Sequence, residues 1–162
     1  MKIFLVVGTL FPFDRLVEII DRWAEKHKDI RVIAQIGYGR YTPGHLEAYG
    51  MIKPEDFNRI FEESDLIIAH AGMGIILKSL VANKPIIVLP RKLELKEHTT
   101  DHQMATAMAL DKLDYIHIAW DNDQLKKYLG KPEKIKSKKV IGDYASDSLI
   151  EALREFIQKA EP

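Results

Sequence analysis

Side chains and glycines suited to ligand binding gather in three short segments of the chain. The first is Gly8-Thr9 with the loop to Asp14, the second runs from His70 to Gly74, and the third from Pro90 to Gln103. Each follows a short apolar run that is typical of a buried strand. Because ligands bind outside the carboxyl ends of parallel strands, at one edge of the sheet, we expect the three segments to converge.

The second segment is the most informative of the three. Its residues are His70, Ala71, Gly72, Met73 and Gly74. Two glycines between a strand and a helix let the backbone approach a ligand and direct free amides at it, which suits a phosphate. The alternative is that they only permit a tight turn. The segment lacks the third glycine of a GxGxxG fingerprint, and the chain has no GxxxxGK[ST] loop, which disfavours an NTP-hydrolysing P-loop enzyme.

The third segment allows three interpretations. Thr100 and Gln103 have the spacing of a helix capping box. Alternatively, four side chains could ligate a metal, since positions four apart share a helix face. As a third possibility, carboxylate and amide groups would bind the hydroxyls of a sugar, and basic groups a phosphate. The polar residues concerned are Arg91, Glu97, His98, Asp101, His102 and Gln103, of which Glu97, His98, Asp101 and His102 form the metal alternative.

Composition narrows the class of protein. A length of 162 residues fits one domain, residues 1–162, with a core of its own. The 24 basic and 24 acidic side chains cancel, which removes the bulk electrostatic argument for a nucleic-acid partner. The absence of cysteine excludes disulfides, thiolate zinc sites and a cysteine nucleophile. The apolar run at residues 3–7 is too short for a membrane span, so we expect a cytoplasmic protein or one held at a membrane by a partner.

Apolar runs alternate with helical periodicity along the chain. Strands are expected at residues 2–7, 31–36, 46–52, 66–69, 86–89 and 116–119. Helices are expected between them, one with Pro12 in its first turn, others from Pro54, from 73 to a stop at Asn83, over 101–110 and over 122–129. A lysine-rich loop at 131–139 and a helix at about 146–160 complete the chain. This order predicts an α/β, Rossmann-like doubly wound and mostly parallel sheet with helices on both faces.

Four stretches in this order resemble a known family. They are Val7 to Thr9 with Pro12 to Val17, then Asp65 to Gly74, Lys84 to Arg91, and Glu97-His98 with Asp101 to Gln103. Together they resemble the C-terminal, donor-binding domain of glycosyltransferase family 28, especially the small subunit of two-component bacterial exopolysaccharide glycosyltransferases. The resemblance implies one half of a GT-B fold that binds a UDP-sugar as substrate and requires neither a cofactor nor a metal.

The resemblance also implies a role for each predicted site residue. Gly8 and Thr9 would face the nucleotide and diphosphate together with His70, Ala71, Gly72, Met73 and Gly74. The donor sugar would lie against Asp101, His102 and Gln103, with Arg91, Glu97 and His98 lining the same cleft. The general base is expected on the partner, and His70 is the one candidate for it in this chain. Many relatives place an acidic residue for the ribose where this chain has Lys78, and an ammonium cannot accept those hydrogen bonds.

The implied function is donor binding for an inverting transfer from a UDP-sugar to a lipid-linked or polysaccharide acceptor. A membrane-associated acceptor-binding subunit would complete the enzyme and hold this chain at the inner face of the membrane. Its contact surface would include Phe11, Tyr38 and Tyr41, through which a homodimer would form if the partner were absent. Two alternatives stay open: a non-catalytic nucleotide-binding or stabilising partner of a membrane-bound transferase, which Lys78 favours, and a metal-dependent hydrolase.

Overall fold

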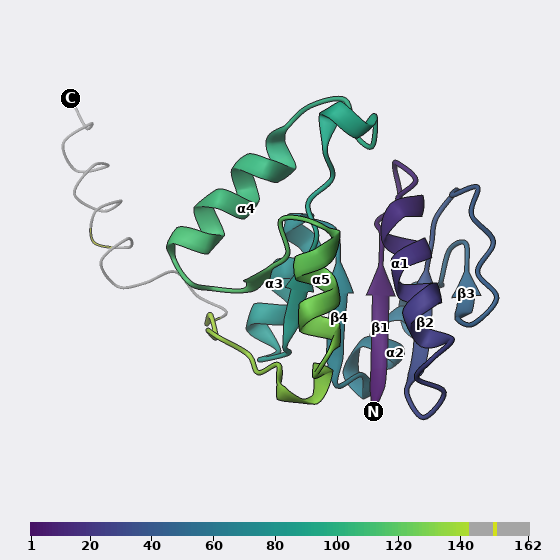
Figure 1. The fold of residues 1–162 in the computed structure, drawn as a ribbon. Coiled ribbons are helices and arrows are strands. Elements are labelled where there is room, and N and C mark those ends of the chain that lie inside the picture. The colour runs from purple at the N-terminus through teal and green to yellow at the C-terminus, as the bar shows by residue number, and fades with distance from the viewer. Residues whose placement is uncertain (143–150, 152–162) are drawn as a thin grey trace.

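A computed structural model describes residues 1–142 and residue 151, and the expected helix at 146–160 lies outside the described residues, apart from that one helical position. One six-stranded sheet forms the centre of the molecule, and every neighbouring pair of strands is parallel (Figure 1). The order across the sheet is β3-β2-β1-β4-β5-β6. The strands are β1 (Lys2–Val6), β2 (Arg31–Gln35), β3 (Glu47–Tyr49), β4 (Leu66–Ala69), β5 (Ile86–Val88) and β6 (His117–Ile118). The predicted Rossmann-like parallel sheet is confirmed.

Helices cover both faces of this sheet. Successive side chains of a strand point to opposite faces, so a central strand contributes to an apolar core on each side. Ile3 and Leu5 of β1 pack in one apolar core with α1 (Asp14–Ala24) and α5 (Asn122–Leu129). Phe4 and Val6 belong to a second core with α2 (Pro54–Glu63), α3 (Met73–Val81) and α4 (His102–Lys112). None of the helices among the described residues is long and apolar enough to cross a membrane.

The strand order reverses direction between β1 and β4. From β1 the chain builds outward through β2 and β3, and it then returns to add β4, β5 and β6 on the other side. The loops after β1 and β4 therefore leave the sheet in opposite directions and open a crevice at the carboxyl ends of these strands. Both loops are segments that the sequence analysis singled out.

Several local predictions differ from the structure. Pro12 lies outside α1, because Phe13 is the N-cap residue. The expected strand at 46–52 is reduced to Glu47–Tyr49, an edge strand with a partner on one side only. The lysine-rich loop contains the short 3-10 helix η2 (Pro132–Lys134), and Pro132 is buried. The stop after α3 is confirmed at Asn83, whose φ of 53° places it in the left-handed conformation that ends many helices.

Candidate functional site

A cavity of about 510 Å³ opens at the carboxyl ends of β1 and β4. The loop after β1, the turn after β4 and the segment after β5 all contribute to it, so the predicted convergence is confirmed. Its lining also includes Gln35 at the end of β2 and Phe57 of α2. The complete lining is Val6, Gly8, Thr9, Leu10, Phe11, Gln35, Phe57, His70, Gly72, Gly74, Ile75, Arg91, His98, His102 and Gln103.

Four of the predicted site residues do not line this cavity. Ala71 is buried in the core beneath α3, and Met73 is exposed at the first position of that helix. Asp101 lines a neighbouring groove between α4 and the 3-10 helix η1 (Leu93–Leu95), and its carboxylate accepts a hydrogen bond of 3.3 Å from the Leu93 amide. Glu97 also lies outside the cavity lining.

His70 fills the crevice between the loops after β1 and β4. A Cβ atom at Gly8 would lie 2.8 Å from the His70 ring, and a Cβ at Gly72 would overlap Nε2. The Nδ1 atom lies 3.4 Å from the Val6 carbonyl oxygen. Burial, and then the nearby Arg91 guanidinium, lower the pKa of His70 to about 4. The imidazole is therefore neutral at pH 7.

The two glycines after β4 have different roles. Gly72 is the N-cap of α3, and the His70 ring leaves no room there for a side chain. Within the part of the chain that the structure describes, Gly74 has no atom within 4 Å of the position its Cβ would take, so it faces open space in the cavity. No side chain of the described residues caps the amino terminus of α3, and the first amides of a helix lack partners within the helix. These amides form the positive end of the α3 dipole, at the cavity wall.

Arg91 positions the loop after β1. Its side chain is 3% exposed, and Nη2 donates hydrogen bonds of 2.5 Å to the carbonyls of Val7 and Phe11. The guanidinium carbon lies 5.0 Å from the centre of the Phe13 ring, and Nε has no hydrogen-bond partner among the described residues. Burial lowers the pKa of Arg91 to about 10, which leaves it cationic at pH 7. A contact of Arg91 with a phosphate would therefore use Nη1 or Nε, because Nη2 is already engaged.

Gln103 and Thr100 do not form the predicted capping box. The Gln103 Oε1 accepts a hydrogen bond of 3.2 Å from the Arg91 amide, and Asp101 rather than Thr100 is the N-cap of α4. The Thr100 hydroxyl lies 2.6 Å from His102 Nδ1. The capping prediction was wrong because these side chains have partners in the cavity wall, which spacing along the chain does not reveal.

His98 and His102 form an aromatic cluster at the outer rim. Their ring centres lie 4.3 Å apart, and the Phe11 ring lies 4.6 Å from His98. The Thr100 amide donates to His98 Nδ1 at 3.2 Å, so Nδ1 is the acceptor and a neutral His98 has its N–H at Nε2. Partial burial, followed by the proximity of His102, lowers the pKa of His98. The sequence predicted these residues as cleft residues but gave no sign that the Phe11 ring would pack against His98.

The titratable side chains of the cavity wall are basic. Arg91 and three histidines line it, and no Asp or Glu side chain among the described residues does so. In the same part of the chain, no group of three or more His, Asp or Glu side chains is arranged to hold a metal ion. The donors present, which are imidazoles, backbone amides and a guanidinium, suit an anion.

Lys78 points away from the cavity. Its ammonium donates a hydrogen bond of 2.9 Å to Asn58 of α2 and lies 4.8 Å from the centre of the Phe61 ring.

Sequence reasoning missed Gln35 and Phe57 as lining residues. Gln35 is the polar residue near the end of an apolar strand, a signal that could have identified it, whereas nothing in the sequence marks Phe57.

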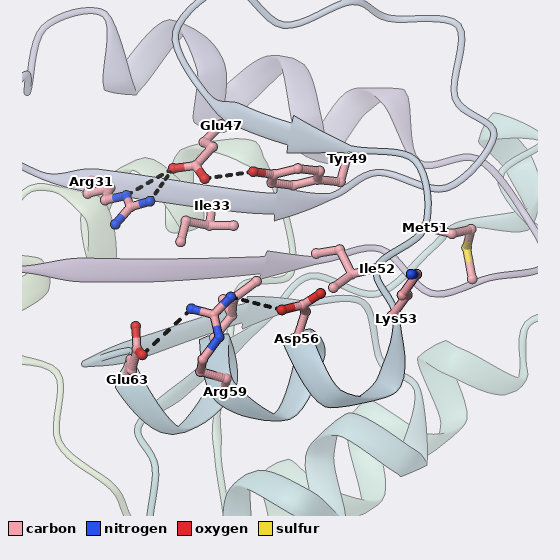
Figure 2. A pocket seen from close by; sticks show the side chains of 11 residues that line it. Arg31, Ile33, Glu47, Tyr49, Met51, Ile52, Lys53, Asp56, Arg59 and Glu63 are labelled. Carbon is pink, nitrogen blue, oxygen red and sulfur yellow. Dashed lines mark hydrogen bonds and ion pairs between the residues drawn. The ribbon is translucent and has the colours of Figure 1, made fainter.

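A second cavity, of about 300 Å³, lies between α2 and the β2–β3 edge of the sheet (Figure 2). Its three carboxylates are already paired. Glu47 accepts from Arg31 at 2.6 Å and from the Tyr49 hydroxyl at 2.8 Å, Asp56 accepts from Arg59, and Glu63 accepts from Lys2. Figure 2 shows the contacts of Glu47 with Arg31 and Tyr49 on one wall of the cavity, and those of Arg59 with Asp56 and Glu63 on the other. The Arg31–Glu47 pair joins β2 to β3, and the Lys2–Glu63 pair joins the start of β1 to α2, which is a structural role.

Comparisons with known proteins agree with this geometry. A segment of 93 residues is 32% identical to the UDP-N-acetylglucosamine transferase subunit ALG13 of Candida albicans (strain SC5314 / ATCC MYA-2876). The segment makes up 57% of this chain and spans 30% of that subunit. The solution structure of ALG13 aligns with a TM-score of 0.58 at 22% identity and 94% coverage of both chains. MurG of Acinetobacter baumannii aligns with a TM-score of 0.62 at 19% identity, over 98% of this chain and 49% of that one.

At these identities the solved structures show the fold alone, which is the Rossmann-like half of a GT-B glycosyltransferase. The family-level match covers almost the whole chain. The family description "Glycosyltransferase family 28 C-terminal domain" matches residues 2–160. The chain therefore belongs to the family of glycosyltransferase family 28 C-terminal domains.

Proposed function

We propose that this protein is the donor-binding subunit of a two-subunit, inverting glycosyltransferase. It binds a UDP-sugar in the cavity between β1 and β4, and a separate subunit binds a lipid-linked or polysaccharide acceptor. The observation that carries the proposal is a cavity at the reversal of strand order, with a helix amino terminus, the Arg91 cation and three histidines in its wall and no carboxylate among the described lining residues. The family membership and the similarity to a UDP-N-acetylglucosamine transferase subunit support it.

In this proposal the chain stabilises the leaving group. As the acceptor oxygen attacks the anomeric carbon, the bond to the diphosphate breaks and negative charge develops on the departing UDP. Amides at the start of α3 face that position without having to reorganise, and such fixed dipoles stabilise developing charge in a site shielded from water. The proposal needs no metal for this step, because the α3 amides and the Arg91 cation supply the positive field.

The general base is proposed to lie on the partner. A base with a pKa of about 4 removes a hydroxyl proton poorly at neutral pH, which makes His70 unsuitable for that step. Its contact with both glycine loops suits ligand binding instead. His98 and His102, at the rim, are placed for the donor sugar, together with Gln103.

The partner is proposed to cover the surface beside the cavity. Leu10, next to the cavity lining residue Phe11, is 83% exposed, and Tyr38 is 75% exposed. Tyr41 is less available, since its hydroxyl donates to the buried Asp21 at 2.8 Å. The chain aligns with 49% of MurG. Through a membrane-associated partner the protein would work at the cytoplasmic face of a membrane, in exopolysaccharide synthesis or a related lipid-linked pathway.

Titration calorimetry with UDP and with UDP-N-acetylglucosamine tests the proposal. We expect saturable binding that Gly74→Trp abolishes, because the new side chain occupies open space in the cavity. The matched control is Leu77→Trp, which places the same side chain on the exposed side of α3, outside the cavity. If neither ligand binds, with or without the co-expressed acceptor-binding subunit, the proposal is wrong. Binding without sugar transfer by the assembled pair would identify a non-catalytic nucleotide-binding partner.

A further inference from the structure

We propose that His70 takes up one proton when a diphosphate binds, and that it thereby distinguishes a diphosphate ligand from an uncharged nucleoside. This inference rests on the proposed donor site. It adds that the ligand binds together with one proton from solvent, and that one ring nitrogen of His70 holds this proton.

The orientation of the imidazole determines which of its nitrogens carries the proton. Nδ1 faces the Val6 carbonyl oxygen at 3.4 Å, and a carbonyl can only accept a hydrogen bond. A neutral imidazole has one N–H group, which this contact assigns to Nδ1. Nε2 is then an unprotonated acceptor, and it faces Gly72 at the amino terminus of α3.

An anion at the start of α3 would meet both the helix amides and the Nε2 atom of His70. The amides at the start of α3 attract a phosphate oxygen, whereas the Nε2 lone pair repels it, because both atoms are acceptors. One proton between the two atoms converts that repulsion into a charge-assisted hydrogen bond. A diphosphate seated at the start of α3 therefore favours the imidazolium form of His70.

The groups around His70 come from several elements of the fold. The segment after β5 contributes Arg91, and the start of α4 with the residues before it contributes His98 and His102. The loop after β1 contributes Gly8, β2 contributes Gln35, and α2 contributes Phe57. In the free protein, burial and the cationic neighbours hold the pKa of His70 at about 4. No carboxylate of the described lining opposes this, so a bound diphosphate would be the first negative charge in the cavity.

Protonation of His70 on ligand binding has a consequence for the transfer reaction. When the bond between the anomeric carbon and the diphosphate breaks, its electron pair goes to the β-phosphate oxygen, and the leaving group gains one negative charge. A His70 imidazolium formed on binding would already face that charge. The proton stays on Nε2 throughout, so His70 acts by charge and hydrogen bonding and transfers no proton in the step.

Calorimetry at pH 7 in buffers of different ionisation enthalpy counts the protons taken up. The main ligand is UDP-N-acetylglucosamine, whose phosphate groups do not titrate near neutral pH, and UDP is used above pH 7, beyond the ionisation of its terminal phosphate. We expect uptake approaching one proton and a dissociation constant that rises towards tenfold per pH unit. Uridine, which lacks phosphate, should bind without proton uptake.

His70→Gln is the test variant, because an amide keeps a hydrogen-bonding side chain and cannot titrate. It should retain weaker binding with no proton uptake, whereas the controls His98→Gln and His102→Gln should keep the uptake. If His70→Gln does not fold, the imidazole nitrogen chemical shifts of His70 in the wild-type protein give the answer, and Nε2 should acquire a proton on addition of the ligand. Saturable binding without proton uptake, or uptake that persists in His70→Gln, would overturn the inference and leave the donor site standing. Failure of both nucleotides to bind would instead overturn the proposed function, and the inference with it.

Discussion

Arg15 of α1 meets Glu97, in the segment before α4, through two N–H···O contacts. Nε lies 2.6 Å from one carboxylate oxygen and Nη2 lies 2.7 Å from the other. Glu97 also accepts the Lys92 amide at 2.9 Å, and Arg15 donates to the Pro90 carbonyl at 3.2 Å. Bidentate pairs of this kind fix geometry as well as adding energy. The pair therefore holds the segment after β5 against α1, and it occupies the Glu97 carboxylate that sequence reasoning assigned to the cleft.

Breaking this pair should destabilise the protein. Glu97→Gln removes the charge with little change in shape, and because both side chains are mostly buried, we expect a loss of about 2 kcal/mol in the free energy of unfolding. Chemical denaturation at pH 7 measures it. Arg22→Ala serves as the control, since it removes an exposed pair with Glu18 and should have a much smaller effect. Equal losses in the two variants would contradict this role for Glu97.

The two glycines after β4 should respond differently to alanine. Gly72→Ala introduces a methyl group into the His70 ring, so it should lower both stability and nucleotide binding. Gly74→Ala places the methyl in open space within a helix, where alanine is favoured over glycine by roughly 0.5–1 kcal/mol. We expect it to fold at least as stably as the wild type and to bind UDP more weakly. Thermal denaturation and calorimetry on both variants separate these effects, and unchanged UDP binding in Gly74→Ala would mean that the ligand lies elsewhere.

The buried, neutral His70 should make stability depend on pH. Its pKa is about 4 in the folded protein and 6.5 as the ordinary value, so between these pH values the unfolded chain binds the additional proton. The free energy of unfolding should therefore fall as pH decreases from 6.5 to 4, with a contribution of up to roughly 3 kcal/mol from this residue. Urea denaturation of wild type and His70→Gln at several pH values isolates it. The lowered pKa values of His98 and His117 act in the same direction but are common to both proteins. Parallel pH profiles would show that His70 is not the group responsible.

Arg91 should be needed for the shape of the loop after β1. Arg91→Lys keeps a cation, but an ammonium on a flexible chain does not reproduce the planar guanidinium against Phe13 and the two carbonyls. We expect a loss of about 2 kcal/mol in the free energy of unfolding, because the Val7 and Phe11 carbonyls lose the guanidinium N–H groups that bind them. The neighbouring Lys92→Arg is the matched control. A fully stable Arg91→Lys protein would show that charge alone, without the fork of donors, holds the loop.

Much of the fold could be predicted from the sequence, because its main elements are encoded locally. Apolar β-branched runs identified the central strands, and the helix over 122–129 was predicted with the observed boundaries, since Asp121 caps it through the Gln124 amide. The edge strand β3 was predicted too long. It has a partner on one side only and exposed or half-buried side chains, so the local sequence carries a weak signal.

The site was predictable in position but not in its internal contacts. The carboxyl-edge rule brought three segments together correctly, because it depends only on strand direction. The partners of Arg91, Glu97 and Gln103 could not be predicted, since each lies on an element distant in sequence. The sequence also could not show that Gly72 makes room for His70 whereas Gly74 faces open space, because this depends on the direction in which the His70 ring points.

The pairing of β1 with β4 joins Ile3 to Leu66, with α1, β2, β3 and α2 between them in the chain. The anion-binding crevice therefore cannot exist until this long-range closure is complete, and parallel closures of this kind are slow steps in folding. A nucleotide can consequently contribute nothing to early collapse. It can only shift the final equilibrium by mass action, so its presence should slow unfolding while leaving the refolding rate unchanged.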